Sequence, residues 1–290
     1  MLKTINMEFK FTPFVGDSAK AMEVETVPGT ALVFLNNIQV SEQAISKNKV
    51  PVMFEEREIS PAVWIPASNL GPALRQGQNK IMIEFQPQDA KTTYEAQLSW
   101  VQITDGITEK TNPGGYSATN QAGEGKETKN GKGKIVLEKE FTADFAADLA
   151  WHHYPAVTTV SDADKQKIAA MLKERAEVFT PNFDGVYRLL KNRPGIDEAG
   201  LRKGKVLEAA YTAGVRIAVP VPGDLEYFVT GNPEVIVRHR SGKLFPLDEQ
   251  PFDRIKDEEM QMGAGMALYM AYPPQLALVR TPAGVWEVVY

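Results

Sequence analysis

One polar, glycine-rich stretch divides this chain into two parts with different patterns. It runs from Thr111 to Lys134 and contains six of the 22 glycines. It offers almost no apolar side chain to a core, so burial cannot offset the entropy of ordering its backbone. We therefore expect a solvated excursion over 111–134 that joins strands over 96–103 and 135–141 as a long-looped hairpin. Strand patterns precede the excursion and helical patterns follow it, which predicts two domains, 1–148 and 149–290.

The composition excludes several classes of function. A net charge of −5 and a pI near 5.4 argue against a nucleic-acid partner, whose phosphates require a basic face. No apolar run approaches the roughly 18 residues that span a bilayer, so we expect no membrane span. Cysteine is absent, which excludes disulfides, thiol catalysis and cysteine zinc sites.

The start of the chain shows no charged segment followed by an apolar one, which is the pattern of a signal peptide. The protein is then either cytoplasmic, or a leader has been removed from the sequence given. The β-sandwich and α+β domains that the sequence predicts favour the second alternative, so we expect a periplasmic or secreted protein.

The first part of the chain has the alternation of apolar and polar residues that is typical of half-buried strands. It is clear over 7–14 and again at Ile81, Ile83 and Phe85. Asn36-Asn37 lies between two apolar runs, and asparagine tolerates the positive φ of a two-residue hairpin turn. Many short strands at this spacing predict an antiparallel β-sandwich or barrel.

Two consecutive pieces of this region, LVFLNNIQV and IPASNLGPALRQGQNKIMIEF, carry a family resemblance. The strand, asparagine turn and strand, followed by a Leu-x-x-Gly-x-Asn entry into the next strand, resemble the galactose-binding-like jelly-roll sandwich over residues 30–86. The resemblance implies a jelly roll. Such domains often bind sugars or accompany glycan-acting modules, while others are purely structural, and no sugar-binding residue pattern carries over.

The second part of the chain reads as an α+β domain, with helices packed on an antiparallel sheet. Ser161 can cap a helix whose apolar face includes Ile168 and Leu172. Further helices are expected over 182–191 and 197–211. Expected strands follow over 215–219, 225–229, 234–240, 266–272, 276–279 and 285–290.

The histidines are candidates for chemistry near neutral pH. His152 and His153 are adjacent, so on a strand only one of them could join His239. Together with a carboxylate such as Asp184 they would form a metal or catalytic site between the domains. The alternative is that the segment from Trp151 to Pro155 is a packing joint.

A second candidate is the cationic run Arg238-His239-Arg240, which could hold a carboxylate or phosphate or could line the solvent face of a strand. Two aromatic residues could stack on sugar rings, Tyr116 and Trp64, but both are expected to be structural, since Trp64 lies in an apolar strand. The candidate ligand-binding residues are Trp151, His152, His153, Arg238, His239 and Arg240.

No nucleotide-binding or serine-hydrolase motif is present in the sequence. We therefore expect no cofactor. We expect a non-catalytic binding or assembly protein that recognises a carbohydrate or a protein partner, with glycans at the bacterial cell envelope as the expected carbohydrate. Two alternatives stay open: an enzyme using His152 or His153, His239 and a carboxylate, and a structural subunit in which the glycine-rich excursion orders against a partner.

Overall fold

The computed structural model describes residues 4–53, 57–107, 119–191, 193 and 196–290, with side chains left undescribed over 105–123. The chain divides into two compact units, Met1–His152 and His153–Tyr290.

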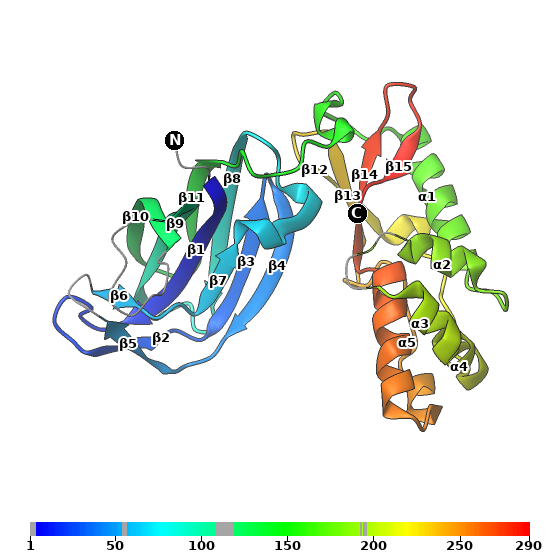
Figure 1. Cartoon of the computed structure of the whole chain (residues 1–290), viewed down its shortest axis with the longest axis horizontal. Coiled ribbons are helices and arrows are strands. Elements are labelled where there is room, and N and C mark those ends of the chain that lie inside the picture. The colour runs from blue at the N-terminus through cyan, green and yellow to red at the C-terminus, as the bar shows by residue number, and fades with distance from the viewer. Residues whose placement is uncertain (1–3, 54–56, 108–118, 192, 194–195) are drawn as a thin grey trace. The chain divides into compact units, whose positions relative to one another are not determined.

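The first unit is built from strands that pair antiparallel (Figure 1). One sheet has the order β10-β9-β1-β2-β5-β6, with β7 also pairing with β1, and the other has the order β11-β8-β3-β4. The prediction of antiparallel sheets is confirmed. The elements are β1 (Thr4–Val15), β2 (Glu23–Thr26), β3 (Gly29–Leu35), β4 (Ile38–Ile45), β5 (Lys49–Met53), β6 (Glu58–Ile59), β7 (Val63–Pro66), η1 (Ala67–Ala73), β8 (Gln78–Pro87), β9 (Thr93–Ile107), β10 (Thr119–Lys132), β11 (Ile135–Thr142) and η2 (Ala150–His153).

Side chains from both sheets meet in the core of this unit. Phe9 of β1 lies 5.0 Å from Phe141 of β11, and Phe11 of β1 lies 5.9 Å from Phe85 of β8, measured between ring centroids. All the residues predicted to form the buried face of β8 are fully buried. Buried aromatic pairs of this kind stabilise a core beyond the area that they remove from water.

The turn between β3 and β4 also follows the prediction. Asn36 and Asn37 have φ values of 52° and 67°, which a two-residue hairpin turn requires and which asparagine adopts at low cost.

Residues 119–132 of the predicted excursion form the strand β10, whose side chains over 124–132 are mostly exposed to solvent, while 111–118 lie outside the described residues. The predicted hairpin is wrong, because β9 pairs with β10 and β11 pairs with β8 in the other sheet. β10 lies at a sheet edge, where lysine and glutamate are favoured because they discourage further pairing. The backbone of β10 is ordered by its hydrogen bonds to β9, without burial of its side chains in a core.

The second unit combines helices with an antiparallel sheet of order β12-β13-β14-β15 (Figure 1). This confirms the predicted α+β composition. The elements are α1 (Asp162–Glu177), α2 (Asp184–Leu190), α3 (Glu198–Gly204), α4 (Val206–Ala213), η3 (Pro222–Asp224), β12 (Leu225–Val229), β13 (Glu234–His239), η4 (Gln250–Arg254), α5 (Glu258–Ala271), β14 (Gln275–Arg280) and β15 (Trp286–Val288).

Helix α1 begins where the sequence predicts. The Ser161 side chain accepts a hydrogen bond from the Asp164 backbone N–H at 3.2 Å, and the Asp164 carboxylate accepts from the Ser161 backbone, which completes a capping box. The same carboxylate accepts a hydrogen bond at 2.9 Å from the indole of Trp286 in β15. The cap of α1 is therefore also a tertiary contact to the sheet.

Two predicted strands of this unit are wrong. The segment 266–272 lies almost wholly in α5, and 215–219 makes only an isolated bridge between Ile217 and Leu247. The buried residues of α5 are Ala264, Ala267, Leu268 and Ala271, which share one face at helical spacing. The Asp257 side chain caps the helix by accepting from the Met260 N–H at 3.0 Å.

Candidate functional site

A row of side chains crosses four strands of the first unit on one face of the sheet. Trp64 of β7 is the cross-strand partner of Lys10 in β1, Lys10 pairs with Ser99 in β9, and Ser99 pairs with Lys126 in β10. Directly opposed residues have Cβ atoms about 4.5–5.5 Å apart. Since neighbouring Phe9 is buried in the core, Lys10 and the row lie on the opposite, outward face.

Trp64 is the aromatic group of this row. The indole is 56% exposed, although Val63 and Ile65 on either side of it are buried. Its Nε1–H donates a hydrogen bond of 3.1 Å to Oε2 of Glu8, which fixes the orientation of the ring. The strand's alternation turns Trp64 outward, while its neighbours face the core; Tyr116 lies outside the described residues.

A groove of about 350 Å³ is lined by Lys10, Ser99 and Lys126 of this row, and Trp64 lies outside its lining. Its lining includes Lys10, Arg57, Glu58, Gln97, Ser99 and Lys126. The Lys10 ammonium lies 2.5 Å from Oε1 of Glu58, so these two charges compensate each other. We name Glu8, Lys10, Glu58, Trp64, Gln97, Ser99 and Lys126 the Trp64 face.

The Trp64 face offers an apolar ring surface next to several hydrogen-bond donors and acceptors. Lys10, Lys126 and the amide of Gln97 donate, while Glu58 and Ser99 accept. A ligand that suits this face has an apolar side for the indole and hydroxyl groups for the neighbouring polar atoms. The arrangement can bind, and it contains no nucleophile paired with a base.

The predicted residues of the interdomain segment make contacts within the first unit. Nε2 of His152 lies 2.9 Å from the Pro72 carbonyl oxygen, and Nη1 of Arg75 donates at 3.0 Å to the His152 carbonyl. The rings of Trp151 and His152 stack edge to face at 4.1 Å. These contacts tie η2 to the residues around η1 within the first unit.

The predicted cationic run lies in the second unit and faces carboxylates of the adjoining strand and turn. Nε of Arg238 is 3.5 Å from Glu226, and Nη1 of Arg240 is 3.7 Å from Asp224. His239 Nδ1 is 2.7 Å from the Ser241 hydroxyl. The cations are thus compensated within the β12–β13 hairpin, and their role in anion binding stays a prediction.

The predicted metal or catalytic set is divided between the units, since His152 belongs to the first and His239 to the second. The carboxylate of Asp184 instead pairs with Arg202 at 3.0 Å, and His153 is exposed. Among the residues whose placement is described, no three histidine, aspartate or glutamate side chains gather closely enough to hold a metal ion.

Comparison with known proteins adds no relative. No family model matches the chain, and no curated protein or solved structure is significantly similar to it. In the described part of the chain, none of the helices combines the length and apolar character needed to cross a membrane.

Proposed function

We propose that the protein is a non-catalytic binding protein that recognises glycans, and that the first unit is a jelly-roll sandwich that binds them through the Trp64 face. Its place of action would be the bacterial cell envelope, in the periplasm or at the surface. The resemblance over residues 30–86 and the antiparallel strands of the first unit support the jelly roll.

The observation that carries the proposal is the exposed, oriented indole of Trp64 in a row of polar side chains. Sugar rings present both an apolar C–H face and a rim of hydroxyl groups. Aromatic rings with polar neighbours are suited to such amphipathic surfaces. The hydrogen bond from Trp64 to Glu8 reduces the entropy that ordering the ring would cost on binding.

The experiment is a thermal-shift screen of the full chain against mono- and oligosaccharides, followed by calorimetric titration of those that raise the melting temperature. Trp64→Ala should weaken binding by about thirtyfold or more, the loss expected when a central tryptophan worth about 2 kcal/mol is truncated. Trp64→Phe should retain part of the affinity because it keeps a ring.

The matched control is Phe228→Ala, which removes an exposed aromatic residue from the second unit and should leave the affinity unchanged. The proposal is contradicted if no saccharide binds, or if Trp64→Ala and Phe228→Ala bind equally well.

A further inference from the structure

Helix α5 exposes an apolar stripe to solvent. Met262, Met266 and Tyr269 are 69%, 49% and 64% exposed, and they follow one another at intervals of four and three residues. This spacing places the three side chains on one face of the helix, over about 10 Å of its length. Exposed apolar residues that stand singly are ordinary, whereas a contiguous group of them marks a site of interaction.

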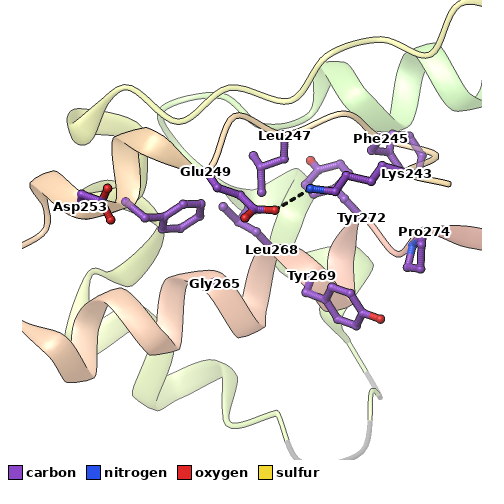
Figure 2. A pocket seen from close by; sticks show the side chains of 11 residues that line it. Lys243, Phe245, Leu247, Glu249, Asp253, Gly265, Leu268, Tyr269, Tyr272 and Pro274 are labelled. Atoms are coloured by element: carbon purple, nitrogen blue, oxygen red, sulfur yellow. Dashed lines mark hydrogen bonds and ion pairs between the residues drawn. The ribbon is translucent and has the colours of Figure 1, made fainter. Parts of the chain in front are cut away.

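A groove of about 430 Å³ continues this stripe (Figure 2). It lies between α5 and the segment 243–253, and Gly265 and Tyr269 of α5 line it. Leu247 and Phe252 also line the groove, and both remain partly accessible to solvent. A Cβ at Gly265 would meet no atom within 4 Å, so the groove is open beside the helix. We name the accessible apolar surface that groove and stripe form together, Leu247, Phe252, Met262, Gly265, Met266 and Tyr269, the α5 groove.

The charged groups at one end of the α5 groove are mainly acidic. The segment 249–259 contains five carboxylates and two basic side chains. Two of these carboxylates, Glu249 and Asp253, line the groove itself. Lys243 compensates Glu249 at 2.6 Å, whereas Asp253 lies at the end of the groove away from Pro274 (Figure 2).

The helix dipole explains only part of this acidity. It favours the acidic residues 257–259 because they lie at the start of α5, but Asp253 lies outside that helix. The rest of α5, 260–271, contains no charged residue. A second copy of α5 therefore has no cations to offer these carboxylates, and charge complementarity favours a basic partner over self-association.

The α5 groove suits a helix better than an extended strand. The backbone groups along α5 are hydrogen-bonded within the helix, so this face presents side chains and no row of free backbone groups for an incoming strand. Amphipathic helices bind such grooves through apolar residues at intervals of three and four, which is also the spacing of Met262, Met266 and Tyr269. Exposed methionines adapt their shape to such partners.

We infer that the α5 groove binds a basic amphipathic helix of a partner protein. The apolar face of that helix lies against Met266 and Tyr269, and its lysine and arginine side chains face the carboxylates of 253–259. Burial of apolar surface supplies the affinity, and the charges orient the partner and speed its association. The inference is independent of glycan recognition, because the groove lies wholly in the second unit.

The test is fluorescence anisotropy of a labelled helical peptide titrated with the full chain. The peptide has leucine at i, i+3, i+4 and i+7 and lysine at the other positions. We expect it to bind at micromolar concentration, with an affinity that falls as salt is added. The matched peptide with glutamate in place of lysine should not bind.

Substitutions in the apolar stripe locate the peptide on the chain. Tyr269→Ala and Met266→Ala should each weaken binding of the lysine peptide by about tenfold, the loss expected for anchors at the centre of an interface. The matched control is Phe228→Ala, which removes an exposed aromatic side chain from β12 of the same unit and should leave the affinity unchanged.

Substitutions of carboxylates test the charge. The double variant Asp253→Asn and Glu259→Gln should weaken binding of the lysine peptide and reduce its dependence on salt, because both carboxylates lie at the acidic end of the groove. The control is Glu287→Gln, which removes one exposed carboxylate from β15 and should change neither quantity.

Each contrary result overturns the inference. Equal affinity for the lysine and glutamate peptides removes the role of the carboxylates. Full affinity in Tyr269→Ala places the peptide elsewhere, and absence of binding at hundreds of micromolar removes the site. A chain that sediments as a dimer and becomes monomeric in Tyr269→Ala assigns the groove to a second copy. Circular dichroism verifies the fold of each variant, and the carboxylate variants provide a test that leaves the apolar side chains intact.

Discussion

The same substitution at two buried tyrosines should change stability in opposite directions. Tyr94 is 2% exposed and its hydroxyl donates to the Gly133 carbonyl at 2.6 Å. Tyr272 is 7% exposed and its hydroxyl has no partner among the described residues. Tyr→Phe deletes one oxygen in each case, so the change in volume is matched and the hydrogen bond is the difference.

The magnitudes follow from this difference. Tyr94→Phe removes a hydrogen bond and leaves a carbonyl unpaired, so it should lower the free energy of unfolding by about 1–2 kcal/mol. The Tyr272 hydroxyl loses its hydrogen bonds to water on folding and gains none from the described residues. Tyr272→Phe removes this cost, so it should raise the free energy of unfolding by about 1 kcal/mol. For a unit of this size that gain corresponds to about 4 °C in melting temperature.

The assay is urea unfolding of the full chain without added ligand. Trp286 reports on the second unit, and Trp64, Trp100 and Trp151 report on the first. Because a chain of two units need not unfold in one step, the transitions are fitted separately. If Tyr272→Phe destabilises the second unit as much as Tyr94→Phe destabilises the first, the Tyr272 hydroxyl has a partner and the reasoning is refuted.

Three further predictions concern packing and pH. Asp164→Asn should destabilise the second unit by about 1–2 kcal/mol in chemical denaturation. Hydrogen bonds from Ser161 and Trp286 hold the Asp164 pKa below its ordinary value of 3.8. The stability that the ionised carboxylate contributes is therefore present at neutral pH and is lost as the pH falls below that value. A variant whose stability falls with acid as steeply as that of the unmodified protein would contradict this. Gly125→Ala should cost the first unit about 1–3 kcal/mol, because its Cβ would lie 2.7 Å from the Trp100 ring; a neutral effect on the melting temperature would show that the ring moves freely. Gly265→Ala should stabilise α5 by up to about 1 kcal/mol, and a loss of stability would mean that the position is not open.

Local signals predict the parts of the fold whose causes are local. The turn at Asn36-Asn37 and the cap at Ser161 each depend on a few consecutive residues. Ile81, Ile83 and Phe85 occupy every second position in the sequence, which predicts that they share one face of a strand. The structure buries all three on that face.

The elements that were missed depend on contacts distant in sequence. Strand β10 is ordered by its pairing with β9, which its glycine and lysine content does not reveal. Helix α5 contains two glycines within the run 263–265, and its small buried residues give a weak periodicity. The exposure of Trp64 could have been predicted from the sequence. Val63 and Ile65 flank it in one strand, and because successive residues of a strand face opposite sides, burial of these two turns Trp64 outward.

The most direct test of glycan recognition is an NMR titration that follows the indole N–H signals of the four tryptophans. The Trp64 signal is assigned by its loss in Trp64→Phe. We expect a binding oligosaccharide to shift the Trp64 signal progressively, while the signal of Trp286, which is buried and hydrogen-bonded to Asp164, stays in place. A bound saccharide that leaves the Trp64 signal unmoved would contradict the account.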